Sequence, residues 1–211
     1  MKKTSFLWIG GIGLALGGIS AHIITHHLSY EHEWRVRRFL RLPLPVPSDI
    51  ILGNPQALVR VYYYYSLTCR YCRTFQSKIL PKIREKYLDT GRLCFVFREF
   101  PDDKISLEGF TLLRSLPSRV YLPLLSVIFA HQVDWLFLQE RLFALFAPFG
   151  ISSQNCQTFL KNSTLSKALL FRRFEEEERL NLSAVPSFII NGKVYEGALP
   201  LSQLEEIIDG K

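Results

Sequence analysis

The sequence predicts an α/β protein, because strand-like and helix-like segments alternate along residues 53–211. A β-branched and aromatic run at residues 58–65 is followed by a segment of helical periodicity and a second such run at residues 92–100. A strand, a crossover helix and a strand predict a parallel strand pair. A helical stretch at residues 105–182 then separates this unit from two short apolar runs around Asn191-Gly192, a strong hairpin signal.

The composition is that of a folded domain with a large core. The chain has 211 residues, 48% of them hydrophobic, and its 16 Phe and 9 Tyr provide ample core volume for one or two domains. Its net charge of +7 is spread along the chain. Because no basic run with interleaved aromatic residues occurs, we expect a solvated surface and no nucleic-acid partner. Four cysteines do not make a disulfide-dense scaffold.

The N-terminus predicts a targeting or membrane segment. Lys2 and Lys3 precede an uncharged stretch at residues 4–25 that is long enough, at helical rise, to cross a bilayer. Residues 1–29 are therefore predicted to be either a signal peptide, cleaved after Ser20, or an uncleaved membrane anchor. The anchor is favoured, because the apolar stretch continues past the candidate cleavage site.

Residues 30–52 are predicted to be a juxtamembrane segment and linker. Four arginines follow the uncharged stretch, and prolines then alternate with apolar residues at 42–47, which favours an extended spacer. Gly53-Asn54-Pro55 is a turn signal, so the folded domain is predicted to span residues 53–211.

The sequence Cys69-Arg70-Tyr71-Cys72 is the strongest chemical signal in the chain. It follows the first strand, so Cys69 is predicted at a helix N-terminus, where free N–H groups and the helix dipole favour a thiolate. Arg70 adds a cation beside it. A thiolate placed there attacks a disulfide, and the second cysteine resolves the mixed disulfide.

Half of a zinc site is the alternative interpretation of this motif. Zinc needs two further ligands, but no second Cys-x-x-Cys occurs and four of the five histidines lie at the N-terminus. Cys94 and Cys156 are isolated and are interpreted as small buried residues. We therefore favour a redox dithiol and expect no metal.

The C-terminal segment is the second informative one. Pro186 cannot lie inside a central strand, so it should open one, and residues 201–208 have the periodicity of a closing amphipathic helix with Ser202 as a possible cap. In the helix after the dithiol, Pro81 should cause a kink.

Three motifs follow one another between Gly53 and the C-terminus: Thr68-Cys69-Arg70-Tyr71-Cys72, Val96-Phe97-Arg98-Glu99-Phe100-Pro101 and Val185-Pro186-Ser187-Phe188-Ile189-Ile190-Asn191-Gly192-Lys193. With these motifs in this order, the sequence resembles the DsbA-like family of thioredoxin-fold disulfide oxidoreductases. The resemblance implies a thioredoxin-like fold with an inserted helical subdomain at about residues 105–182, preceded here by the N-terminal membrane-spanning or signal helix.

The resemblance also implies roles for individual residues. Cys69 is expected to be the exposed nucleophile and Cys72 the buried resolving partner, with their disulfide as the only redox group and no cofactor. Val185 and Pro186 are expected to form a cis-proline loop against the dithiol, where an extended substrate chain pairs as an added strand. Reduced exported proteins are the expected substrates, and a membrane quinone-linked thiol oxidase is the expected reoxidant.

Two positions depart from the family pattern. Arg70 and Tyr71 replace the more usual Pro and His between the cysteines, and this pair is expected to tune the thiolate. Tyr63 stands six residues before Cys69, where relatives commonly carry a buried acid, and a phenol moves protons poorly near neutral pH.

These observations favour an oxidase that introduces disulfides into exported proteins. Such an enzyme belongs in an oxidising compartment, which predicts the periplasmic side of a bacterial inner membrane, anchored through residues 4–28, or the soluble periplasm after cleavage. The alternatives are a reductase or isomerase of the same fold, a membrane-anchored peptide-binding module with little turnover, and a metal site.

Overall fold

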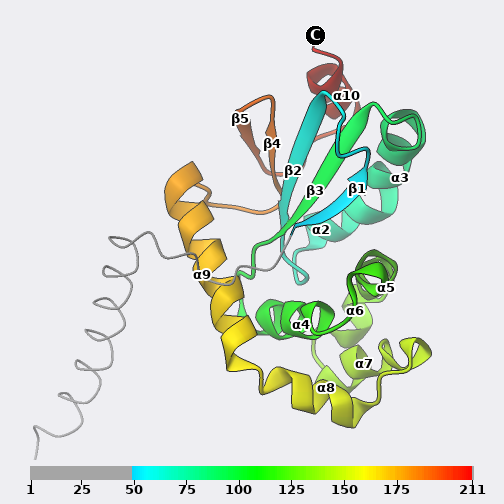
Figure 1. The fold of residues 1–211 in the computed structure, drawn as a ribbon, viewed down its shortest axis with the longest axis vertical. Coiled ribbons are helices and arrows are strands. Elements are labelled where there is room, and N and C mark those ends of the chain that lie inside the picture. The colour runs from blue at the N-terminus through cyan, green and yellow to red at the C-terminus, as the bar shows by residue number, and fades with distance from the viewer. Residues whose placement is uncertain (1–48, 211) are drawn as a thin grey trace, which may run out of the picture. The chain divides into compact units, whose positions relative to one another are not determined.

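A five-stranded sheet forms the centre of the domain in the computed structural model, which describes residues 49–210. Its strand order is β1-β3-β2-β4-β5 (Figure 1). The strands are β1 (Ile50–Gly53), β2 (Val59–Tyr65), β3 (Leu93–Glu99), β4 (Ser187–Ile190) and β5 (Lys193–Glu196). Strands β2 and β3 are parallel and every other neighbouring pair is antiparallel. The predicted strand–helix–strand unit is therefore confirmed.

Strand β1 corrects the predicted start of the domain. Residues 50–52 were expected to belong to the linker, but together with Gly53 they pair antiparallel with β3, from Ile50 opposite Phe97 to Gly53 opposite Cys94. A four-residue edge strand that directly follows a proline-rich segment carries too few residues to show an alternating pattern. The turn at Gly53 thus ends a strand and does not begin the domain.

The helix after Cys69, called here the dithiol helix, runs from Arg70 to Leu88 in four segments. They are α2 (Arg70–Thr74), the π-helical η1 (Phe75–Ile79), α3 (Leu80–Ile83) and the π-helical η2 (Arg84–Leu88). Pro81 lies in the first turn of α3, directly after η1. Because proline has no N–H to donate to the preceding turn, the π-helical segment before Pro81 has a local cause. The kink expected at Pro81 stays a prediction.

A group of helices joins β3 to β4, as expected for residues 105–182. They are α4 (Lys104–Arg114), α5 (Ser118–Ala130), α6 (Gln132–Trp135), α7 (Gln139–Ala144), the 3₁₀ turn η3 (Ala147–Phe149), α8 (Ser153–Leu160) and α9 (Ser163–Leu180). In Figure 1, α4 to α8 lie together and α9 leads from them back to the level of the sheet.

The C-terminal hairpin follows the prediction closely. Asn191 and Gly192 link β4 to β5 with positive φ angles of 52° and 77°, which a two-residue turn matched to strand twist requires. The closing helix α10 (Leu201–Asp209) packs Leu204 and Ile208 into the core. Its cap is Pro200 and not Ser202.

The alternation of β2 divides its side chains between two apolar clusters. Val61, Tyr63 and Tyr65 face the main core, which also contains the buried faces of the dithiol helix, α5 and α10. Tyr64 points the other way, into a smaller cluster with Phe100 and Leu182 near the end of α9. A strand buried on both faces has few alternating polar residues, which explains its nearly continuous tyrosine run.

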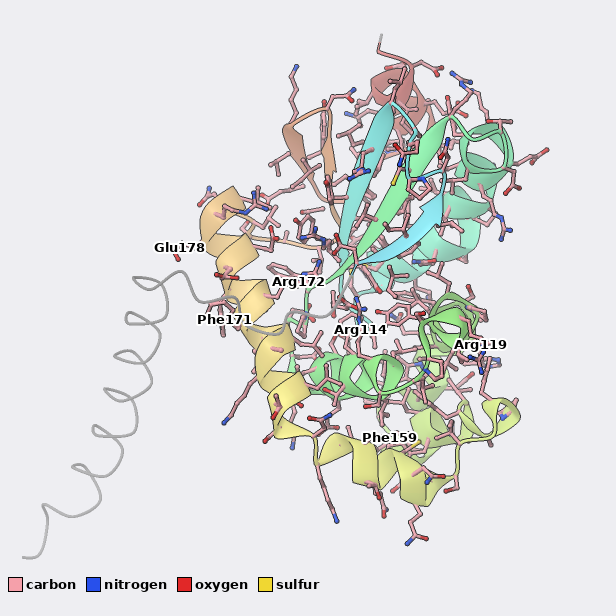
Figure 2. All side chains as sticks on the ribbon, viewed as in Figure 1. Arg114, Arg119, Phe159, Phe171, Arg172 and Glu178 are labelled. Carbon is pink, nitrogen blue, oxygen red and sulfur yellow. The ribbon has the colours of Figure 1, made fainter. Side chains whose placement is uncertain are left out.

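An ionic network fastens α9 to the sheet. Figure 2 labels two of its members, Arg114 on α4 and Arg172 on α9. Arg172 pairs with Asp49 and lies 4.0 Å from the buried Glu99, and Arg114 also pairs with Glu99. Arg98 bridges Asp49 and Glu176 at 2.7 and 2.8 Å. Ion pairs therefore connect the helical insertion to β3. The helical periodicity of the sequence does not predict these pairs.

The predicted signal or anchor, residues 1–29, and most of the predicted linker lie outside the described residues. Within residues 49–210, no helix combines the length and the apolar character that a bilayer crossing needs.

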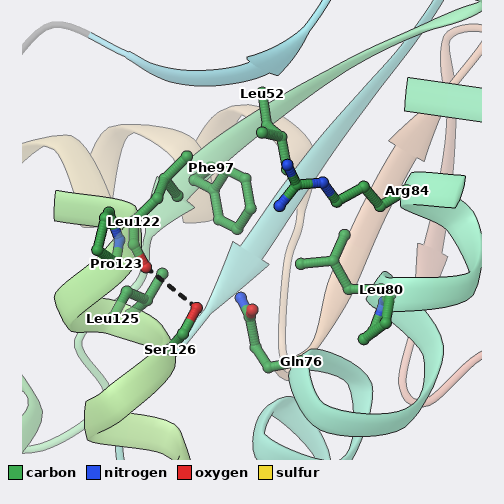
Figure 3. Close-up of a pocket in the computed structure, with 10 residues that line it drawn as sticks. Leu52, Gln76, Leu80, Arg84, Phe97, Leu122, Pro123, Leu125 and Ser126 are labelled. Atoms are coloured by element: carbon green, nitrogen blue, oxygen red, sulfur yellow. Dashed lines mark hydrogen bonds between the residues drawn. The ribbon is translucent and has the colours of Figure 1, made fainter. Parts of the chain in front are cut away.

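A hollow of about 300 Å³ opens between β1, the dithiol helix and α5 (Figure 3). Its wall is mostly apolar and is formed by Leu52, Gln76, Leu80, Pro81, Arg84, Phe97, Leu122, Pro123, Leu125 and Ser126. Since neither cysteine of the dithiol nor Pro186 lines it, the hollow is distinct from the candidate site described next.

Candidate active site

Cys69 is the N-cap residue of the dithiol helix. Its backbone is extended, and its Sγ accepts a hydrogen bond from the backbone N–H of Cys72 at 3.3 Å. The thiol is thus placed where the first N–H groups of the helix have no carbonyl partner, and it supplies the acceptor they lack. Cys69 is half-buried, whereas Cys72 is fully buried one turn later.

The surroundings of Cys69 lower its thiol pKa from 9.0 to about 7. The largest cause is the hydrogen bond from the Cys72 thiol, and the backbone N–H groups of Cys72 and Tyr71 act in the same direction. Burial and the Asp102 carboxylate oppose them. Near neutral pH a large fraction of Cys69 is therefore thiolate, the reactive form in disulfide exchange.

Cys72 has the opposite character. Burial and the neighbouring Cys69 raise the pKa of its thiol well above 9.0, while the Ser66 N–H and the Tyr63 side chain act in the opposite direction. The two sulfurs therefore differ in both exposure and acidity, with one poised to react and the other held as a thiol.

The Val185–Pro186 loop lies against the dithiol. Its peptide bond is cis, and the Cys69 thiol donates to the Val185 carbonyl oxygen at 3.4 Å. The loop is fixed on its far side by the Ser187 hydroxyl, which donates to the Ala184 carbonyl at 2.7 Å, and by the Gly197 N–H, which donates to the Pro186 carbonyl at 2.8 Å. The structure therefore brings together Cys69, Cys72, Val185 and Pro186, all predicted to belong to one site.

Arg70 and Tyr71 interact mainly with each other. The Arg70 guanidinium donates to the Tyr71 hydroxyl at 2.6 Å and lies 4.6 Å from the centre of its ring. Tyr71 acts on Cys69 through its backbone N–H, and the residue as a whole is 48% exposed. The tuning role assigned to the two side chains stays a prediction.

Three groups beneath the dithiol were not predicted. Gln132 on α6 donates its side-chain amide to the carbonyls of Leu67 and Cys69 at 2.7 and 3.1 Å. The Asp102 carboxylate accepts hydrogen bonds from the hydroxyls of Ser66 and Thr68 beside the dithiol. The Ser106 hydroxyl accepts a hydrogen bond from the Leu67 N–H at 3.0 Å. Asp103 with Ser106 is an N-cap pattern visible in the sequence, but no local signal connects Gln132 to a loop sixty-three residues away.

The remaining cysteines lie apart from this chemistry. Cys94 on β3 and Cys156 on α8 are both fully buried, and both are free thiols. Within residues 49–210, no group of three or more His, Cys, Asp or Glu side chains is arranged to hold a metal ion.

The family model described as thioredoxin matches residues 46–210, which is most of the chain. The chain therefore belongs to the thioredoxin family. The match of the family model begins at residue 46, which agrees with the inclusion of β1 in the domain.

Relatives and solved structures place the chain among the DsbA-like members of that family. A Rickettsia conorii protein named "Putative protein-disulfide oxidoreductase" is 27% identical over 166 residues, which cover 77% of this chain and 60% of the relative. The crystal structure of Wolbachia pipientis alpha-DsbA1 matches with 25% identity and a TM-score of 0.70, over 81% of this chain and 94% of the other. BdbD from Bacillus subtilis, at 21% identity and a TM-score of 0.68, shares the fold over 78% of this chain and 95% of its own.

The chain spans about 60% of the length of the Rickettsia conorii relative. The match of the family model, residues 46–210, covers the thioredoxin-like domain with its helical insertion.

Proposed function

We propose that this protein is a thiol–disulfide oxidoreductase that introduces disulfides into exported proteins through Cys69 and Cys72. The observation that carries the proposal is the arrangement of the half-buried Cys69 sulfur, which the Cys72 N–H approaches at 3.3 Å and which lies 3.4 Å from the Val185 carbonyl. It combines an activated sulfur, a buried second sulfur and an adjacent stretch of backbone.

The proposed reaction moves two electrons from a client to the enzyme. A client thiolate attacks the Cys69 sulfur of the Cys69–Cys72 disulfide, and Cys72 leaves as a thiolate that takes up a proton. A second client thiolate then attacks the client sulfur of the mixed disulfide, and Cys69 leaves. The client now holds a disulfide and the enzyme a dithiol, which a membrane quinone-linked thiol oxidase would reoxidise.

Substrates are proposed to bind as extended chains beside Val185 and Pro186. The Val185 carbonyl already faces the Cys69 sulfur, so a backbone that pairs with this loop brings its own cysteine to the reacting atom. The exposed Tyr71 ring adds apolar surface next to the nucleophile. Backbone pairing does not depend on the client's amino-acid sequence. An enzyme that acts on many exported proteins needs this kind of recognition.

A reductase or isomerase is the second candidate, and one observation favours it. A thiol pKa of about 7 at Cys69 stabilises the reduced enzyme only modestly, whereas a strong oxidant needs a nucleophile of much lower pKa. The direction of the reaction thus depends on the reduction potential. Oxidation remains the preferred direction if residues 4–28 deliver the domain to the periplasmic side of the inner membrane.

The test uses the purified full-length chain. Its reduction potential is measured against glutathione, and its ability to oxidise a reduced two-cysteine peptide is measured with and without excess oxidant. The proposal predicts a potential well above that of the glutathione couple and complete loss of peptide oxidation in Cys69→Ser. A potential below that couple would indicate the reductase instead.

Cys156→Ser provides the control, because Cys156 is a free thiol on α8 that lies apart from the dithiol. This variant should retain peptide oxidation. If wild type and Cys69→Ser both bind the reduced peptide but neither oxidises it, the protein is a binding module and the proposal fails.

A further inference from the structure

The Tyr63 hydroxyl is a buried donor with a poor partner. The side chain of Tyr63 has no exposed surface, and its hydroxyl lies 3.5 Å from the Cys72 carbonyl oxygen, longer than an ordinary O–H···O hydrogen bond. Buried polar groups in proteins are normally well paired, because an unmade hydrogen bond costs free energy. The hydroxyl is therefore available to a stronger acceptor that forms during the reaction.

The Tyr63 ring is held rigidly at this position. It stacks on Tyr65 and Phe188 with centroids 5.0 and 5.2 Å away, and it contacts Phe75 at 4.7 Å. These neighbours come from β2, from β4 just after Pro186 and from the dithiol helix just after Cys72. The hydroxyl is thus preorganised by the same elements that position the dithiol.

Cys72 is the acceptor that this arrangement fits. Its side chain is fully buried, so a negative charge on its sulfur receives no water and depends on protein donors. Burial first, and the neighbouring Cys72 next, raise the pKa of the Tyr63 phenol well above 10.0. Tyr63 therefore keeps its proton at neutral pH and acts as a donor, never as a base.

We propose that the Tyr63 hydroxyl donates a hydrogen bond to the Cys72 thiolate that forms each time the Cys69–Cys72 disulfide is opened. This inference rests on the proposed function and deepens it. When a client thiolate attacks Cys69, the S–S bond breaks and its electron pair goes to Cys72, whose sulfur then takes up one proton, equal to the one that the client thiol lost on ionising. Tyr63 neither gains nor loses a proton in this step and lowers its barrier by stabilising the negative charge on the Cys72 sulfur.

The buried carboxylate at the end of β3 is paired with other groups. Glu99 accepts from Arg114 and, at 2.7 Å, from the Tyr121 hydroxyl, which in turn lies 2.8 Å from the Tyr65 hydroxyl. Within the described residues, the strongest influences on the pKa of Cys72 include Ser66 and Tyr63 but no carboxylate. Among these influences, the Tyr63 phenol is the side chain that lowers the pKa of Cys72.

The test is Tyr63→Phe in the full-length chain, with Tyr64→Phe as the matched control. Tyr64 is the next residue of the same strand, but its hydroxyl bonds to Glu176 at 2.9 Å on the other face. The thiol pKa of Cys72 is measured by NMR titration of ¹³C-labelled cysteine in a Cys69→Ser background. The pKa should rise by about one unit in Tyr63→Phe, the effect of losing one hydrogen bond to a charged group, and stay unchanged in Tyr64→Phe.

A kinetic measurement completes the test. Attack of a small thiolate on the oxidised enzyme should be about tenfold slower in Tyr63→Phe than in the wild type. The reduction potential should be the same in the two proteins, because Cys72 is a protonated thiol in the reduced state of both. An unchanged Cys72 pKa, or equal effects of the two substitutions, would overturn the inference.

The titration needs no turnover, so it remains decisive even if the protein oxidises no client and the proposed function fails. Should Tyr63→Phe not fold, 3-fluorotyrosine placed at position 63 keeps the ring and makes the hydroxyl a stronger donor. The Cys72 pKa should then fall, and a constant value would again contradict the inference.

Discussion

Gln132 holds the loop of Cys69 from a helix sixty-three residues further along the chain. Its side-chain amide donates to the carbonyls of Leu67 and Cys69 at 2.7 and 3.1 Å, and the side chain is buried. The helical insertion therefore contributes directly to the position of the nucleophile.

Replacing Gln132 with Leu should destabilise the protein by about 2 kcal/mol, because two buried carbonyls then lose their donor. Urea unfolding of the reduced protein measures the change. Gln139→Leu is the control, because Gln139 makes its hydrogen bond to Glu108 at the surface. Equal effects of the two substitutions would show that the Gln132 contacts contribute nothing specific.

The reactivity of Cys69 should follow a thiol of pKa about 7. The alkylation rate is expected to reach half of its plateau near pH 7 and to shift to higher pH in Cys72→Ala, since the Cys72 thiol is the largest cause of the lowered pKa. Cys72→Ser, whose hydroxyl still donates, should shift less. A profile centred near pH 9.0 in the wild type would contradict this prediction.

The lowered pKa of Cys69 also has a consequence for stability. A group with a pKa depressed by folding contributes stability above its unfolded pKa, here 9.0, and loses it as pH falls through about 7. The reduced protein should therefore gain stability over Cys69→Ser as pH rises from 7 to 9. The oxidised protein, which has no Cys69 thiol to titrate, should show no such gain.

Glu99→Gln should cost about 3 kcal/mol, because the carboxylate is buried, pairs with Arg114 and accepts the Tyr121 hydroxyl. Glu177→Gln is the control, since Glu177 forms only a partly exposed pair with Arg173 and should change stability by less than about 0.5 kcal/mol. Thermal unfolding of both variants at one pH measures the two stability changes. Equal losses of stability would contradict the prediction.

Gly53→Ala should be more damaging than Gly192→Ala, although both glycines have positive φ angles, of 88° and 77°. A Cβ at Gly53 would lie 2.4 Å from the Leu93 carbonyl oxygen, whereas a Cβ at Gly192 meets nothing within 4 Å. The second substitution should therefore cost only the conformational strain of about 1 to 2 kcal/mol. Similar melting temperatures for the two variants would disprove the steric argument.

Local patterns predicted the parts of the fold that depend on neighbours in the chain. The β2–β3 pair, the dithiol at a helix N-terminus and the Asn191-Gly192 turn each have a local cause, namely β propensity, helix capping and positive φ. The same is true of Cys69 and Cys72 within the site, whose spacing alone places both on one helical turn.

Long-range contacts account for what the sequence did not reveal. The Gln132 amide, the Asp102 carboxylate beside Cys69 and the Arg172–Glu99 contact join residues that are far apart in the chain and follow no period. Strand β1 was missed for a related reason, since its pairing with β3 and not its own residues defines it. Such features follow from tertiary packing, which no periodicity encodes.

The two outermost strands of the sheet, β1 and β5, are each only four residues long, and β5 begins with Lys193 and ends with Glu196. Short, charged borders offer a passing polypeptide little to extend into a continuous ladder. For a protein proposed to handle unfolded clients, this restricts productive pairing to the loop beside the nucleophile and guards the molecule against co-aggregating with the chains it serves.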